Sequence, residues 1–380
     1  MFMKKVIIII VALTVVLVGV RAYQYNSRKS EKAKTIKIGA IFDQTGDVAS
    51  YGEDELKSVK LAVEEINGAG GINGRKIELI PENAPALDVR QNISAFNKLV
   101  DVDGVVAIIG PNWDDAVSAL IPLAEKAKIP VVSPDPDGGQ RTSKDVAHEY
   151  YFSLWYPQDV EAEKLADFLS SREVKKIDIL RNLDPFSQKE YELIKGTTAK
   201  YHIALVSDIQ VVDSGVKDFR SQIIKLKADK VDAVFVNFQN PEAKCPALKQ
   251  LGDLAFDKII IGESSTETIS CKDLLEGTFY SFPNATKKSQ DLNARFVKKY
   301  GVAPKTPAVP NAYDATIMIA DALRGGNLTG TDIKDYLKNL KTFDGALGPS
   351  ISFDSQNNLK LTASDFVIKT IKNGNIQIVP

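Results

Sequence analysis

The stretch AVEEINGAGGINGRKIELI, residues 62–80, places four glycines within the seven positions 68–74. Such a segment can cradle a phosphate or form a tight corner between two elements. A dinucleotide-binding loop needs a strand before the glycines and a helix after them, because the helix N-terminus holds the pyrophosphate. Here apolar residues recur at helical spacing before the glycines, and RKIELI after them has the pattern of a strand. The glycines are therefore predicted to end a helix and turn the chain into a strand.

The rest of the chain alternates apolar strands with amphipathic helices. Strands are predicted at TIKIGAIF, RKIELI, VVAIIG, IPVVS, KKIDIL, IALVSDIQVV, VDAVFV and KIIIGE. Helices are predicted near 53–67, 88–101, 115–127, 158–171, 187–200, 216–228 and 242–252, and later near 287–300, 309–323 and 331–340. This order predicts an α/β protein whose parallel sheets are covered by helices on both faces. Irregular stretches near 145–160 and 278–288 suggest two lobes with crossing connections.

The N-terminus has the layout of an export signal. Lys4 and Lys5 precede an unbroken apolar run, residues 6–20, which ends at Arg21. The run is short for a membrane span, which needs about 20 residues. Residues 1–22 are therefore predicted to be either a cleaved signal peptide or a retained membrane anchor, and residues 23–34 a polar tether. Both alternatives place the protein in the periplasm or at the extracellular face of the membrane.

Composition excludes several function classes. The net charge is −1, and no long basic run follows the first 34 residues, which argues against nucleic acid as a partner. The two histidines, His148 and His202, have no nucleophile beside them, and no metal or phosphate motif predicts a cofactor or an enzyme. Cys245 and Cys271 follow consecutive predicted strands, so in an exported protein we expect a disulfide with Cα atoms roughly 4.4–6.8 Å apart.

Four motifs carry a resemblance to a known family. The first motif, IKIGAIFDQTGDVASYGEDELKSVKLAVEEINGAGGINGRKIELI, resembles the opening of the leucine/isoleucine/valine-type solute-binding proteins. VVAIIGP with IPLAEKAKIPVVSP, then NAYDATIMIADAL and LGPSISFDSQNNLK, are similar to later elements of that family. The resemblance covers roughly residues 35–370. It implies a type I periplasmic binding fold, in which two Rossmann-like lobes joined by three hinge strands hold a small solute for an ABC transporter's permease subunits.

The resemblance also implies where the chain divides. Lobe 1 would consist of residues 35–153 plus 283–350, and lobe 2 of residues 154–282 plus 351–380. The hinges would fall near 153–156, 281–283 and 351–353. A ligand-sensing ectodomain for a signalling partner is the alternative function, because the same fold serves both roles. No signalling module follows the domain, which favours transport.

The candidate pocket residues of the first lobe are a tyrosine, a tryptophan and three acids. Tyr51 is the tyrosine of the Ser-Tyr-Gly motif. Where the family often has a carboxylate-binding serine after Gly-Pro, this chain has Asp114, preceded by Trp113. Asp135 and Asp137 replace small and hydroxyl residues after the next strand. Plainer interpretations stay open: Asp114 can be a helix N-cap, the Asp-Pro-Asp-Gly-Gly segment an ordinary turn, and Trp113 a core residue.

In the second lobe, the matched pocket positions are mostly aromatic or polar. Phe186 takes the place of a family tyrosine, and Phe238 or Gln239 follows a later strand. Glu263 or Ser264 lies where an ammonium-binding acid often occurs in the family.

The acids in the first lobe restrict the solute. A solute carboxylate about 4 Å from one of them would cost about 4 kcal/mol at an effective dielectric of 20. A micromolar ligand binds with about −8 kcal/mol, so two such contacts would remove most of its affinity. A cation, an amide or a polyhydroxylated molecule suits these acids better than an α-amino acid in the usual orientation.

Overall fold

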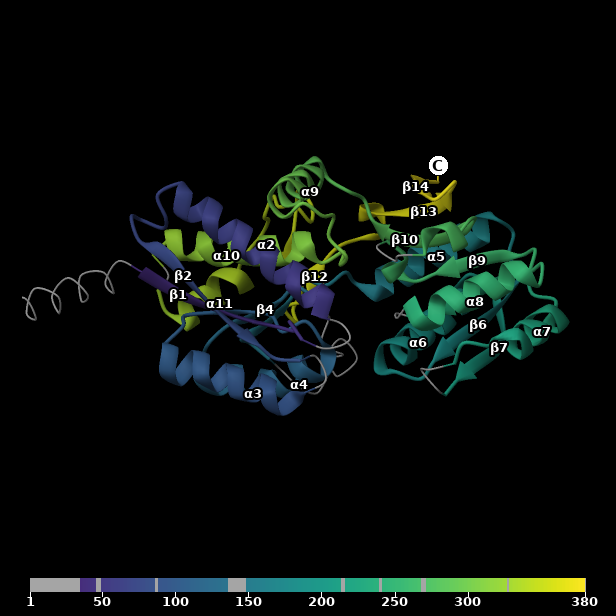
Figure 1. Cartoon of the computed structure of the whole chain (residues 1–380), viewed down its shortest axis with the longest axis horizontal. Helices are drawn as coiled ribbons and strands as arrows, with labels where there is room; N and C mark the ends of the chain where they lie inside the picture. The colour runs from purple at the N-terminus through teal and green to yellow at the C-terminus, as the bar shows by residue number, and fades with distance from the viewer. Residues whose placement is uncertain are drawn as a thin grey trace, which may run out of the picture.

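A computed structural model describes residues 35–45, 49–85, 88–135, 148–212, 216–238, 241–267, 271–326 and 328–379. The predicted signal and tether, residues 1–34, lie outside the described residues. Figure 1 shows two α/β bodies side by side, each built around one sheet. The first body contains the start of the chain together with late helices, and the second contains the middle together with the final strands. The parallel-sheet lobes predicted from the sequence are thus present.

The first sheet has five parallel strands in the order β2-β1-β3-β4-β5. Their bounds are Thr35–Phe42 (β1), Lys76–Asn83 (β2), Ile108–Ile109 (β3), Val131–Ser133 (β4) and Tyr151–Ser153 (β5). The central strands are apolar and buried, as expected for a sheet covered on both faces.

Helices from two distant parts of the chain cover the first sheet. The early ones are α2 (Ala49–Gly68), α3 (Val89–Asn97), with a π-helical turn η1 (Lys98–Asp103), and α4 (Asp114–Ala127). The late ones are α9 (Lys287–Tyr300), α10 (Val309–Arg324) and α11 (Gly330–Lys338). Helices α10 and α2 pack against each other, and the Ser58 hydroxyl donates a hydrogen bond to the Val309 carbonyl at 2.7 Å. The late segment therefore completes the core of the first sheet.

The four glycines form a corner between helix and strand, as the sequence predicts. Helix α2 ends at Gly68 and β2 begins at Lys76. Gly70 and Gly71 have φ values of +102° and +76°, which side chains rarely tolerate. A Cβ atom at Gly71 would lie 2.2 Å from the Arg75 carbonyl oxygen. Backbone geometry therefore requires glycine at positions 70 and 71 of this corner.

The second sheet has seven strands in the order β14-β13-β10-β9-β8-β6-β7. Their bounds are Lys176–Asn182 (β6), Ala204–Val211 (β7), Ala233–Asn237 (β8), Ile259–Gly262 (β9), Thr278–Pro283 (β10), Phe366–Lys372 (β13) and Asn375–Ile378 (β14). Strands β6 to β10 are parallel, whereas β13 and β14 are antiparallel. The helices of this body are α5 (Gln158–Ser171), α6 (Pro185–Lys200), α7 (Arg220–Asp229) and α8 (Pro241–Asp253).

Three segments connect the two bodies, and they contact one another. The first crosses after β5, where the Tyr156 ring lies 5.1 Å from the ring of Phe282 at the end of β10. The third includes the two-stranded ribbon of β11 (Ser352–Phe353) and β12 (Leu359–Lys360), and the Phe353 ring lies 5.1 Å from Phe152. These segments include the three stretches predicted as hinges. Bending at them stays a prediction.

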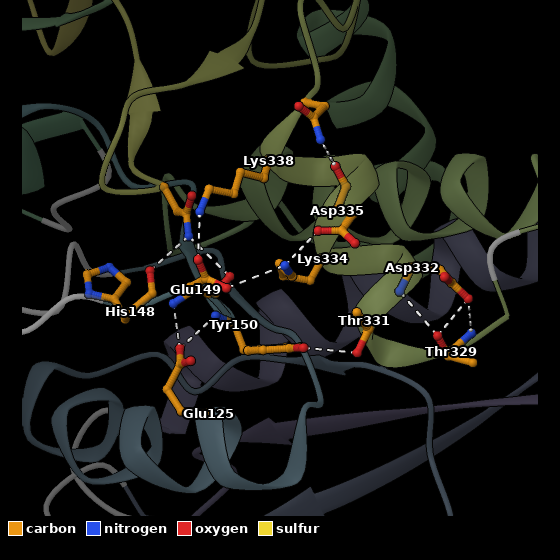
Figure 2. Close-up of polar contacts among 12 residues, drawn as sticks. Glu125, His148, Glu149, Tyr150, Thr329, Thr331, Asp332, Lys334, Asp335 and Lys338 are labelled. Atoms are coloured by element: carbon orange, nitrogen blue, oxygen red, sulfur yellow. Dashed lines mark hydrogen bonds and ion pairs between the residues drawn. The ribbon is translucent and has the colours of Figure 1, made fainter.

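A polar network fixes the start of β5 between α4 and α11 (Figure 2). The Glu125 carboxylate accepts the backbone N–H groups of Glu149 and Tyr150 at 2.6 and 2.7 Å. On the other side, the Glu149 side chain is paired with Lys334 and Lys338, which lower its pKa. Because this rim is exposed, we regard the network as fixing the chain path and not as a large source of stability.

Candidate functional site

The candidate site lies at the carboxyl ends of the parallel strands in the two bodies. Ligands of open α/β sheets bind beyond these ends, and binding sites favour domain interfaces. In the first body, Asp43 follows β1, Trp113 follows β3 and Asp135 follows β4. In the second body, Phe238 follows β8 and Glu263 follows β9.

Trp113 and Asp114 begin α4, but not in the arrangement that the N-cap interpretation requires. Trp113 is the N-cap, in an extended conformation with φ −149° and ψ 145°, and Asp114 is the first helical residue. The interpretation of Asp114 as an N-cap is therefore wrong by one position. Asp114 and Asp115 still place negative charge in the first turn, which the helix dipole favours. The Trp113 indole N–H is buried without a hydrogen-bond acceptor among the described residues.

Asp135 lies at the end of β4, next to the end of β3. The Ser133 hydroxyl, which can donate to either oxygen, lies 2.7 Å from the Pro111 carbonyl and 3.0 Å from the Asp135 carbonyl. Asp135 is partly buried and acts electrostatically on Glu55. Tyr51, also partly buried, lies one turn before Glu55 in α2. Asp137 lies outside the described residues. Tyr51, Asp114 and Asp135 thus occupy the carboxyl edge of the first sheet or the helices that start there.

Glu55 is a buried acid of this edge that the sequence reasoning missed. It is 0% exposed, and the Thr306 hydroxyl lies 3.4 Å from its Oε1. Its Oε2 has no hydrogen-bond partner among the described residues. Burial, then the charge of Asp135, raise the pKa of Glu55 well above its usual range. Helical spacing gives a signal for it, because Glu55 lies on the same face as the buried Val59.

The predicted aromatic residues of the second body are buried. Phe186 is the second residue of α6. Phe238 lies in the hydrophobic core, with its ring 5.4 Å from that of Phe219. Gln239 lies outside the described residues. In this conformation, Phe238 contributes packing to the second body.

Glu263 forms a buried ion pair with a lysine that the sequence reasoning did not include. The Lys244 ammonium, in the first turns of α8, donates to Glu263 Oε1. The other carboxylate oxygen, Oε2, accepts the Ser265 backbone N–H at 2.6 Å. Ser264 is also buried and begins the 3₁₀ turn η3 (Ser264–Glu267). Glu263 is therefore neutralised by the protein itself, which its position in the sequence did not reveal.

Two further acids lie close to this pair. The charges of Glu263 and Lys244 both act on Glu161 of α5 and on Glu190 of α6. Both acids are buried, and burial is the largest cause that raises the pKa of each well above its usual range. Glu161 Oε1 and Glu190 Oε2 have no hydrogen-bond partner within the described part of the chain. Their signal in the sequence is weak, since Glu161 only shares a helix face with the buried Leu165.

The disulfide joins α8 to the segment that follows β9. Cys245 directly follows Lys244, and Cys271 lies just before the short turn η4 (Lys272–Leu274). Their Cα atoms are 6.1 Å apart, within the range expected from the sequence. The bond therefore fastens the helix that carries Lys244 to the segment that carries Glu263.

Comparison with known proteins identifies the family. Residues 35–374 match the family model of the periplasmic binding proteins. The chain belongs to this family. Among its relatives, the leucine-, isoleucine-, valine-, threonine- and alanine-binding protein of Pseudomonas aeruginosa is 25% identical over 340 residues, which cover 87% of this chain and 89% of the relative. A Leu/Ile/Val-binding protein of Rhizobium johnstonii is 29% identical over 265 residues, covering 68% of this chain and 70% of the relative.

Solved structures of periplasmic binding proteins share the fold. The substrate-binding protein LivJ of a branched-chain amino acid transporter from Streptococcus pneumoniae, in complex with isoleucine, gives a TM-score of 0.76 at 26% identity. The alignment covers 91% of this chain and 99% of LivJ. A periplasmic ligand-binding protein from Burkholderia xenovorans gives a TM-score of 0.81 at 17% identity, covering 91% and 94% of the two chains. The family and the type I fold predicted from the sequence are confirmed.

Membership of this family has two direct consequences. The chain is a binding protein and not an enzyme, in agreement with the P. aeruginosa relative, which is named as a binding protein, and with LivJ, which is named as the substrate-binding protein of a transporter. Its place is outside the cytoplasm, as for a periplasmic binding protein. Within the described ranges, no helix has the length and apolar character that a membrane span requires.

Proposed function

We propose that this periplasmic binding protein captures a small polar solute between its two lobes and delivers it to the permease subunits of an ABC importer. The observation that carries the proposal is the pair of polar edges, one at the carboxyl ends of each sheet. Each edge holds buried carboxyl groups with oxygens that lack a hydrogen-bond partner among the described residues, namely Glu55 in one and Glu161 and Glu190 in the other. Such atoms are costly unless a ligand or water satisfies them.

We propose lobe boundaries that follow the predicted division. Lobe 1 would comprise residues 35–153 plus 283–350, and lobe 2 residues 154–282 plus 351–380. The strand membership of the two sheets and the packing of α10 on α2 support this division. Anchoring of the protein through residues 6–20 remains a second proposal, supported only by the apolar run.

The acids at the first edge set the expected solute class. Asp114 begins α4 and Asp135 follows β4 at this edge of lobe 1, and their negative charges would repel a solute carboxylate nearby. We therefore expect an amide, a cation or a polyhydroxylated molecule, and weak or absent binding of leucine, isoleucine and valine. The P. aeruginosa relative is named for binding those amino acids, so the expected difference is specific to this chain.

Native mass spectrometry of the purified protein tests the proposal, because a retained solute adds its own mass to the protein ion. Titration calorimetry with leucine, isoleucine and valine tests the solute class separately. Submicromolar binding of any of the three would overturn the repulsion argument and leave the receptor function intact. A protein that copurifies with no solute and binds none from a library of amides, amines and polyols would contradict the receptor function.

A further inference from the structure

Lys244 is a fully satisfied buried cation. A lysine ammonium has three protons to donate. Here the acceptors are Glu263 Oε1, the Ser265 hydroxyl at 2.8 Å and the Thr266 hydroxyl at 3.3 Å. The Lys244 side chain is 1% exposed and the Glu263 side chain 0%. Both lie at the carboxyl edge of the second sheet, where the proposed function places the solute.

Both carboxylate oxygens of Glu263 already accept hydrogen bonds from the protein. Oε1 accepts from Lys244 and from the Ser265 hydroxyl, and Oε2 accepts from the Ser265 backbone. A solute ammonium that took the place of Lys244 at Glu263 would leave a buried lysine without its counter-ion. Breaking a buried pair in this way is strongly unfavourable, because it leaves an uncompensated buried charge.

The remaining polar groups of this edge are an amide and two buried carboxyl groups. Gln158, the first residue of α5, is 3% exposed, and neither its amide nitrogen nor its amide oxygen has a partner among the described residues. Burial raises the pKa values of Glu161 and Glu190. The Gln158 amide can donate through its nitrogen and accept through its oxygen. It therefore matches an uncharged solute group that also donates and accepts hydrogen bonds.

We propose that Lys244 is a specificity-determining residue. Its ammonium occupies the Glu263 carboxylate, so that lobe 2 binds a carboxamide group of the solute and rejects a primary ammonium group. This inference rests on the proposed receptor function and narrows its solute class. The acids of lobe 1 act on a different part of the solute and already disfavour a carboxylate. A solute with a neutral carboxamide satisfies both edges.

Two probe molecules that differ only in an ammonium group test this preference. Leucinamide and 4-methylpentanamide share the same carbon skeleton and carboxamide, and only leucinamide carries an α-ammonium. Neither has a carboxylate, so repulsion by lobe 1 does not confuse the comparison. Calorimetry with the wild-type protein should show at least about tenfold tighter binding of 4-methylpentanamide, equivalent to about 1.4 kcal/mol.

The substitution Lys244→Met tests the role of the residue. It keeps a long apolar stem and removes the ammonium, so that Glu263 becomes available to leucinamide and the preference should reverse. Lys249→Met is the matched control, because Lys249 lies on the same helix and pairs with Asp253 at an exposed position. This control should keep the wild-type preference. If the wild type binds neither probe, gain of leucinamide binding by Lys244→Met still supports the proposal.

A second variant guards against failure to fold. Lys244→Met with Glu263→Gln removes both charges, which is far less disruptive than removing one partner. It should fold and keep the wild-type preference, since no free carboxylate is created. The proposal is overturned if the wild type prefers leucinamide, if folded Lys244→Met keeps the wild-type ratio, or if neither protein binds either probe. A copurified solute with a primary ammonium would also overturn it, while supporting the receptor function.

Discussion

Asp178 of β6 is a buried carboxyl group beside Asp229 of α7, away from the candidate site. Burial first, and then the charge of Asp229, raise the pKa of Asp178 from 3.8 to about 6. A raised carboxyl pKa in the folded state means that ionisation costs the folded state more than the unfolded state. The protein should therefore lose stability from this group as the pH rises from about 4 through 6.

The substitution Asp178→Asn should remove this pH dependence. We expect the variant to match the wild type near pH 4 and to be more stable than the wild type at pH 8, because the asparagine never ionises. Urea unfolding at the two pH values measures the difference. Asp257→Asn is the control, since the Asp257 side chain is 81% exposed. If Asp178→Asn gains no stability over the wild type between the two pH values, the assignment is wrong.

At the residue scale, the sequence could predict positions at the strand ends but not their partners. The acids Asp114, Asp135 and Glu263 follow strands, so their place at the sheet edge is readable from the pattern. The pairing of Glu263 with Lys244 joins two elements 19 residues apart, and no local spacing encodes it. Periodicity predicts apolar residues on buried helix faces, so it gives only a weak signal for the buried acids Glu55, Glu161 and Glu190.

Gly52 allows close contact between helix α2 and the end of strand β1. It lies in α2, and a Cβ atom there would be 2.1 Å from the carbonyl oxygen of Asp43, which follows β1. Gly52→Ala must move α2 away from the strand end, and overpacking of this kind costs about 1–3 kcal/mol. Gly68 at the end of the same helix has open space around its position, so Gly68→Ala should be neutral or slightly stabilising.

Thermal unfolding of these two glycine variants provides the measurement. Only the first should lower the melting temperature. Equal melting temperatures for the two variants would show that the contact between Gly52 and Asp43 is not tight in solution.

The disulfide constrains a second element, α8. Replacing both cysteines with serine frees α8 from the segment after β9. For a closed loop of this length, with a sequence separation of 26, the chain-entropy model predicts a loss of about 3 kcal/mol. Urea unfolding should show this loss, and the wild type with dithiothreitol should match the variant. Unfolding curves that coincide with and without the reductant would contradict the prediction.

At the element scale, the sequence predicts the type and order of most elements and misplaces some ends. The glycine corner and the alternation of strands and helices are clear from composition and periodicity. The helix predicted near 88–101 instead becomes α3 followed by the π-helical turn η1, which continues to Asp103. The antiparallel direction of β13 and β14 is set by pairing with β10, a tertiary contact that periodicity does not carry.

The two bodies in Figure 1 are connected by three neighbouring segments, and we predict that bending at these segments lets the bodies move relative to each other. A solute that contacts both edges favours the closed population, because it binds that state better. We expect small-angle scattering to show a smaller radius of gyration with the true solute, while each lobe moves as a rigid body. An analogue that does not bind is the control. An unchanged scattering curve despite tight binding would rule out closure as the signal of occupancy.

The interleaved path of the chain also bears on its biosynthesis. Helix α10 covers α2 only after about 240 intervening residues have been made, and β13 joins β10 later still. Both lobes need segments from the last third of the chain, so neither can complete its core while the ribosome is still adding that part. Non-local contacts of this kind also form slowly. A polypeptide whose hydrophobic cores stay incomplete for so long remains unfolded and can pass through a secretion channel. We therefore expect this topology to delay folding until the protein has left the cytoplasm. The cysteines can then oxidise in the compartment outside it.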